Sequence, residues 1–132
     1  MIDVQGLLRK YPNGTFATKS GDSIKLRAFQ YLFGEGDRVY FCTANDKPVF
    51  KQMKEDVNVA FCTYAADFSE VLSLSGKAVF VDDVGLKQRA LDENPMIKGI
   101  YKSSDNPVFE LFYLEVKEVE YFKAGETVRE KR

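Results

Sequence analysis

The sequence has no histidine and no tryptophan, and only two cysteines, Cys42 and Cys62, among its 132 residues. Without histidine, the chain lacks Ser-His and Cys-His nucleophilic chemistry, histidine-ligated haem and histidine-bearing zinc sites. Both cysteines lie in strand-like segments, so free buried thiols are expected rather than a redox pair. No metal site is predicted, and chemistry in this chain is expected to depend on a cofactor or on carboxylates.

An excess of charge and a long apolar run are also missing. Lys and Arg number 19 and Asp and Glu 20, giving a net charge of −1, which argues against a nucleic-acid-binding protein. No apolar run reaches bilayer length and the N-terminus lacks signal-peptide features, so no membrane contact and a cytoplasmic location are expected. The composition, 45% hydrophobic and 30% charged, is that of one globular domain covering residues 1–132.

Alternation of apolar and polar residues predicts six strands joined mostly by hairpins. Helices are expected before the first strand and after the third and fifth strands. The fold class is therefore mainly β (α+β), an antiparallel barrel of six strands with short helices at its side. The charged last ten residues, 123–132, are expected to be frayed. The expected strands are 15–19, 23–33, 39–45, 57–65, 71–81 and 109–122, and the helices 2–11, 46–54, 83–93 and 96–101.

The stretch 39–54 combines a predicted strand with a predicted helix start. Asp46 is expected to cap the helix, and Pro48 fits its first turn. Lys47 and Lys51 are four residues apart and share a face there, although the helix dipole disfavours cations at this end. A phosphate between the two lysines would remove this conflict. A surface helix with solvated lysines explains the same residues.

The stretch 23–33 alternates, and one of its two faces is unusual for a solvent face. One face combines the cations Lys25 and Arg27 with Phe29, Tyr31 and Phe33. A planar ligand with an anionic end would explain this set, with the rings near the plane and Arg27 near the anion. A dimer interface with cations at its rim explains it as well, and the two explanations are compatible.

Four segments, taken by their order and spacing, resemble the pyridoxamine 5′-phosphate oxidase-like family. The similarity runs over residues 16–122, and it is greatest to the small single-domain flavin-binding members. The segments are VYFCTANDK at 39–47, KQM at 51–53, LSGKA at 74–78 and FELFYL at 109–114.

This resemblance implies a split β-barrel homodimer with an FMN in each of two clefts between the subunits. Arg27 matches an arginine that reaches the flavin phosphate, and the backbone after it would lie along the isoalloxazine ring. Cys42 and Thr43 occupy the place of an aromatic-Thr pair, and Lys47 that of a phosphate contact. Catalytic residues are not indicated. The implied cofactor-binding residues are Arg27, Ala28, Phe29, Gln30, Cys42, Thr43, Lys47 and Lys51.

The chain also departs from the longer oxidases of that family. Pro48 and Val49 stand where those enzymes carry a basic pair, and residues 127–132 contain neither tryptophan nor the Arg-x-His substrate motif. These differences argue against a true pyridoxamine 5′-phosphate oxidase. The absence of histidine also argues against the haem-degrading and nitroimidazole-resistance relatives that depend on one.

The function that the resemblance implies is an FMN-binding oxidoreductase. It would transfer hydride or electrons between a reduced nicotinamide or similar donor and a small-molecule substrate. One alternative is a flavin-binding protein without turnover, with a sensor, storage or regulatory role. Another is a barrel that binds a deazaflavin or no ligand at all.

Overall fold

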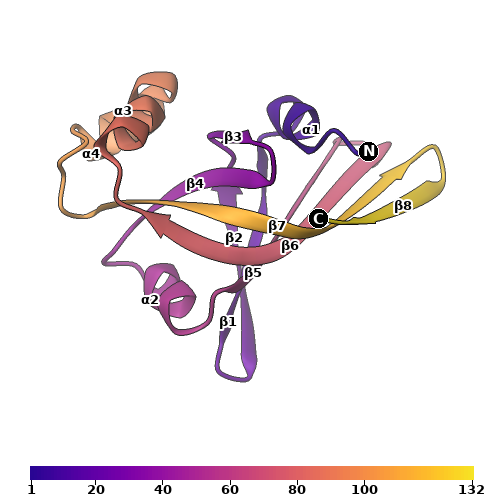
Figure 1. The fold of residues 1–132 in the computed structure, drawn as a ribbon, viewed down its shortest axis with the longest axis horizontal. Helices are drawn as coiled ribbons and strands as arrows, with labels where there is room; N and C mark the ends of the chain where they lie inside the picture. The colour runs from indigo at the N-terminus through magenta and orange to yellow at the C-terminus, as the bar shows by residue number, and fades with distance from the viewer.

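The computed structural model describes all 132 residues as four short helices placed around one antiparallel β-sheet (Figure 1). None of the four helices has the length and apolar character of a membrane span. The helices are α1 (Val4–Lys10), α2 (Pro48–Glu55), α3 (Val84–Glu93) and α4 (Pro95–Tyr101). The strands are β1 (Asn13–Ser20), β2 (Ser23–Gln30), β3 (Phe33–Glu35), β4 (Arg38–Ala44), β5 (Asn58–Tyr64), β6 (Glu70–Val81), β7 (Phe109–Lys123) and β8 (Glu126–Lys131).

The sheet contains eight strands in the order β2-β1-β5-β6-β7-β4-β3, and β8 pairs with β7. All pairs are antiparallel, as predicted. The two end strands, β2 and β3, do not pair with each other, so the sheet is not closed. The predicted count of six strands is wrong, because β3 and β8 were not recognised.

Strand β8 lies in the tail that was expected to be frayed. A two-residue turn, Ala124 and Gly125 with φ of 54° and 79°, reverses the chain after β7. Positive φ at both central residues is the geometry that closes a tight hairpin. The charges of the tail find partners across this hairpin, since Arg129 Nε donates to Glu120 Oε2 at 3.0 Å.

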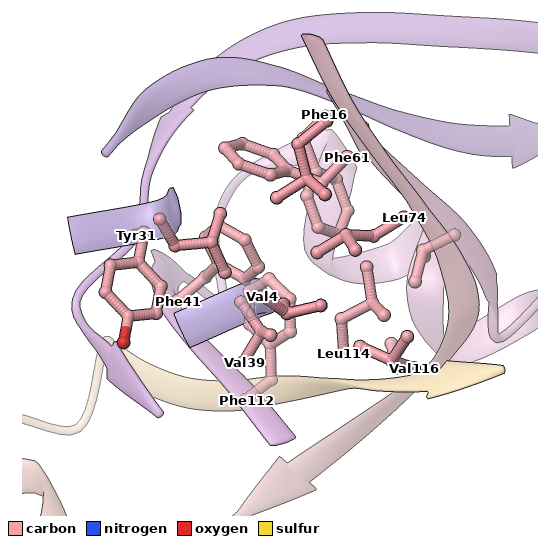
Figure 2. Close-up of a cluster of buried hydrophobic side chains, with 14 of the residues drawn as sticks. Val4, Phe16, Tyr31, Val39, Phe41, Phe61, Leu74, Phe112, Leu114 and Val116 are labelled. Carbon is pink, nitrogen blue, oxygen red and sulfur yellow. The ribbon is translucent and has the colours of Figure 1, made fainter. Parts of the chain in front are cut away.

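The core consists of two buried clusters on either side of the strongly bent sheet. The larger one gathers Phe16, Phe41, Phe61 and Phe112 from four different strands (Figure 2). The smaller one packs α3 and α4 onto β4 and β7, and it includes Ile97 and Tyr101 of α4. Figure 1 shows α3 and α4 together at one end of the sheet and β8 at the other. The smaller cluster therefore fixes the position of α4 against the strands.

The two faces of β2 are arranged differently from the interpretation of residues 23–33. Phe29 stacks on Phe16 with ring centroids 4.8 Å apart, while Tyr31 is buried in the larger cluster. The opposite face is open, with Ile24 72% and Leu26 67% exposed. The three aromatic side chains of 29–33 thus pack in the core: Phe29 of β2 and Tyr31, just after it, in the larger cluster, and Phe33 of β3 in the smaller one.

Candidate functional site

The start of α2 is an uncapped helix N-terminus. Lys47, not Asp46, is the N-cap residue, and no side chain accepts a hydrogen bond from the first turn, which also contains no acid. The reason is Pro48, because the residue before a proline avoids the helical conformation, and Lys47 is extended with φ −96° and ψ 149°. Pro48 has no N–H, and the Phe50 N–H already donates to the Lys47 carbonyl oxygen at 3.2 Å. The Val49 amide and the positive end of the helix dipole are therefore what this first turn offers to an anion.

A cavity of about 430 Å³ opens beside this helix end. Three parts of the chain form its wall: β2, the end of β4 with the start of α2, and α4. No acidic residue belongs to the lining. The lining residues are Arg27, Ala28, Phe29, Gln30, Cys42, Thr43, Lys47, Pro48, Val49, Ile97 and Tyr101.

Seven of the eight residues implied by the resemblance line this one cavity, although they come from two separate segments. The eighth, Lys51, lies outside it. The Lys51 side chain is 80% exposed, and its ammonium faces the Glu55 carboxylate at 3.9 Å. The spacing of four residues places Lys51 one turn along α2 from Lys47, but its side chain points to solvent.

Arg27 brings an uncompensated positive charge to the cavity. Its Nη1 donates to Thr18 Oγ1 at 2.7 Å, and its Nη2 donates to Gln52 Oε1 at 2.9 Å. Both acceptors are neutral, and Arg27 takes part in none of the ion pairs of the molecule. Partial burial lowers the pKa of the guanidinium, which is the direction expected for a cation that no carboxylate balances.

The two other titratable groups of the lining are uncharged at neutral pH. Burial raises the pKa of the Cys42 thiol to about 12, although the nearby Lys47 lowers it. Burial likewise raises the pKa of the Tyr101 hydroxyl to about 12, with smaller contributions from Cys42 and Asp46. Neither group cancels the charge of Arg27 and Lys47, so the cavity is electrostatically positive.

Four lining residues were missed by the sequence analysis as site residues. Pro48 and Val49 are the first two residues of α2 and come directly after Lys47, whereas Ile97 and Tyr101 belong to α4. All of Met96, Ile97, Ile100 and Tyr101 are apolar at helical spacing, so the pattern alone does not say which pair faces inward. In the structure Ile97 and Tyr101 are buried, whereas Met96 is 69% and Ile100 63% exposed.

Two other hollows of the surface are less suited to an anion, because acidic side chains line them. A cavity of about 660 Å³ near α2 and α3 contains Lys54 and Lys87, but also Asp82, Asp105 and Glu110. A groove of about 320 Å³ along β6, β7 and β8 includes three glutamates. No group of three or more Cys, Asp or Glu side chains is placed to hold a metal ion.

Comparison with known proteins finds no matching family model and no matching curated protein. Among solved structures, a NimC/NimA family protein from Clostridium acetobutylicum is 26% identical and superposes with a TM-score of 0.84, covering 94% of this chain and 86% of that chain. A protein of the pyridoxinephosphate oxidase family from the same organism, related to general stress protein 26, is 13% identical with a TM-score of 0.80, covering 96% and 89%.

A haem-binding protein from Mycobacterium smegmatis superposes as well, with 16% identity, a TM-score of 0.78, and coverage of 96% of this chain and 55% of that chain. These superpositions cover nearly the whole sheet and its helices. These likenesses in fold agree with the family resemblance of the sequence. The chain therefore has the split-barrel fold of the pyridoxamine 5′-phosphate oxidase-like proteins.

Proposed function

We propose that the cavity binds FMN through its phosphate and that the protein is an FMN-dependent oxidoreductase. One observation carries this proposal: Arg27 and Lys47 line the same cavity beside the uncapped N-terminus of α2, and no acidic residue lines that cavity. Two uncompensated cations beside the positive end of a helix dipole are features that recognise a phosphate group. A bound FMN would supply hydride or electron transfer between a reduced nicotinamide or similar donor and a small substrate.

The residues of the cavity divide into two ends. At the phosphate end, Arg27 and Lys47 would donate charge-assisted hydrogen bonds, and the hydroxyl of Thr43 would add a neutral one. At the other end, the flavin ring would lie along Ala28 and Gln30 of β2. Strand β2 pairs only with β1, so the main-chain groups on its outer edge have no strand partner. These groups are free to hydrogen bond to the polar edge of a ring.

Haem fits this cavity less well than FMN. The chain has no histidine, and burial raises the pKa of the Cys42 thiol to about 12, which disfavours the thiolate form that ligates haem iron. Tyr101 is also protonated. Although one structural neighbour binds haem, we therefore do not propose haem as a ligand of this chain.

We also propose that the protein is a homodimer with the cavity at the subunit boundary. Ile24 and Leu26 form an exposed apolar strip on the outer face of β2, the same strand that supplies Arg27 to the cavity. Exposed apolar side chains gathered beside a binding site are typical of a protein interface. A second copy placed on this strip would cover it and close the open side of the cavity.

Purified protein titrated with FMN tests the proposal. We expect saturable binding, seen as a shift of the flavin absorption bands, followed by oxidation of NADH or NADPH when electron acceptors are added. Binding without turnover under all acceptors would favour the sensor, storage or regulatory role. Tight binding of a deazaflavin with no binding of FMN would show that the cofactor is the deazaflavin and not FMN. A protein that binds neither refutes the proposal.

A further inference from the structure

The guanidinium of Arg27 is held by two residues that do not line the cavity, Thr18 of β1 and Gln52 of α2. Besides the two bonds from Arg27, Thr18 Oγ1 donates to Gln52 Oε1 at 2.7 Å. The three side chains thus form a closed triangle of hydrogen bonds. Thr18 is only 1% exposed, so this triangle is a built part of the interior and not a surface contact.

The triangle uses two of the five N–H donors of a guanidinium, which leaves three donors without a protein partner. Because Arg27 itself lines the cavity, these donors are available to a ligand there. An arginine side chain has many rotamers, and fixing it for a ligand costs conformational entropy. The two bonds to Thr18 and Gln52 meet this cost before the ligand arrives.

Gln52 has a second property that suits this role, since its amide oxygen accepts hydrogen bonds without carrying a charge. A carboxylate in the same place would hold Arg27 equally well but would neutralise it. Gln52 also lies on α2, whose N-cap residue is Lys47, whereas Arg27 lies on β2. The triangle therefore ties the two cation-bearing elements together across β1.

We infer that Gln52, supported by Thr18, is a positioning residue that aims the charge of Arg27 at the anionic group of the ligand. This inference rests on the proposed function, since it concerns the phosphate end of the same cavity. It predicts a specific pattern: loss of Gln52 weakens the binding of the phosphorylated ligand and leaves the binding of its unphosphorylated form unchanged.

The test compares FMN, riboflavin and inorganic pyrophosphate as probes of the wild-type protein and three variants. Gln52→Met keeps the volume but removes the acceptor, Thr18→Val removes the hydroxyl, and Gln52→Glu keeps the acceptor but adds a charge. Gln88→Met, on the exposed face of α3, is the matched control. Thermal unfolding of each variant shows whether it is folded.

We expect about a tenfold loss of FMN affinity in Gln52→Met and in Thr18→Val, no change for riboflavin, and no change in Gln88→Met. Gln52→Glu is expected to lose at least as much, although it retains the bond to Arg27. Equal losses for FMN and riboflavin in folded variants, or unchanged FMN affinity, would overturn the inference.

Pyrophosphate separates this inference from the proposed function, because it reports on the anion end without a flavin. If wild-type protein binds pyrophosphate but not FMN, the FMN proposal fails, and the same tenfold loss of pyrophosphate affinity in Gln52→Met still supports the positioning role. If the wild-type protein binds neither, both are refuted.

Discussion

The positive charge of the cavity comes from two side chains, Arg27 and Lys47, and each can be replaced by itself. We expect Arg27→Ala and Lys47→Ala each to weaken FMN binding about tenfold to a hundredfold, because a charge-assisted hydrogen bond contributes about 1.5–3 kcal/mol. Neither side chain belongs to a buried cluster, so the fold should persist. Quenching of flavin fluorescence on binding gives the dissociation constants.

Lys51→Ala is the informative comparison for this pair. The sequence places Lys51 in the phosphate site, whereas in the structure its side chain is exposed and faces Glu55. We therefore expect a smaller loss of FMN affinity in Lys51→Ala than in Lys47→Ala. A loss as large as that of Lys47→Ala would mean that Lys51 turns toward the phosphate when FMN binds.

Glu70 is a buried carboxylate whose charge is stabilised by three side chains from distant parts of the chain. Lys10 Nζ and the hydroxyls of Tyr11 and Tyr121 all donate to it. These hydrogen bonds, led by the one from Lys10, lower the pKa of Glu70 to about 2. Since the folded pKa is below the ordinary value of 4.5, this stabilisation is complete above pH 4.5 and is lost as the pH falls toward 2.

Replacing Glu70 by Gln is expected to lower the free energy of unfolding at pH 7 by about 1.5–3 kcal/mol. It should also remove part of the decline in stability between pH 4.5 and 2, because the group no longer titrates. Urea unfolding at a series of pH values measures both effects. If the free energy of unfolding of Glu70→Gln fell as steeply between pH 4.5 and 2 as that of the wild type, other carboxylates would be the cause of the decline.

Individual site residues were predictable from the sequence only where a local pattern marked them. Arg27 and Lys47 stand out because each is a cation where apolar or acidic residues are typical. Thr18 and Gln52 carry no such signal, since a threonine on a strand and a glutamine on a helix are ordinary residues. Their importance follows only from the packing of α2 against β1, which is a long-range contact.

At the scale of whole elements, the sequence predicted most helices and strands but not all of their ends. The predicted strands 71–81 and 109–122 correspond closely to β6 and β7, because both strands are long and rich in apolar residues. Strand β7 supplies side chains to both core clusters. Strand β8 was missed because five of its six residues are exposed, so no buried face shapes its pattern. Strand β3 has only three residues, too few for any period to be seen.

The junction of β6 and β7 contains a feature that a single substitution can test. Ser75 pairs with Glu118 and Gly76 with Val116, so Lys117 forms a bulge in β7. A Cβ atom on Gly76 would lie 1.9 Å from the carbonyl oxygen of Glu115, which only a backbone shift can relieve. Glycine is therefore required where the two longest strands approach each other.

We expect Gly76→Ala to lower the free energy of unfolding by about 1–3 kcal/mol, the usual cost of overpacking. Gly99→Ala is a suitable control, because a Cβ at Gly99 in α4 would meet nothing within 4 Å and alanine favours a helix. Thermal unfolding followed by circular dichroism compares the two. Equal melting temperatures for wild type and Gly76→Ala would show that the two strands can move apart here with no loss of stability.

At the scale of the molecule, the open sheet leaves its two end strands in different situations. Strand β3 is short and its first residue, Phe33, is buried in the smaller cluster. Strand β2 has eight residues, an unpaired edge and the exposed apolar side chains of Ile24 and Leu26. An edge of this kind promotes association unless a partner covers it. The alternation in 23–33 marked the face with Phe29 and Tyr31 as unusual. Only the structure shows that these rings are packed in the core and that the exposed apolar side chains, Ile24 and Leu26, lie on the opposite face.

If a second copy covers β2, a charge placed on its outer face should separate the subunits. We expect the wild-type protein to have about twice the mass of the 15.0 kDa chain in solution, and Leu26→Glu to have the mass of one chain. FMN affinity should fall in the same variant, because Leu26 is adjacent to Arg27 and the proposed interface closes the cavity.

The control is Val128→Glu, on the exposed face of β8, which should remain dimeric. Light scattering after size-exclusion chromatography distinguishes the dimer from the single chain. A Leu26→Glu protein that is still dimeric would place the interface elsewhere, and a wild-type monomer that binds FMN with full affinity would show that one subunit completes the site.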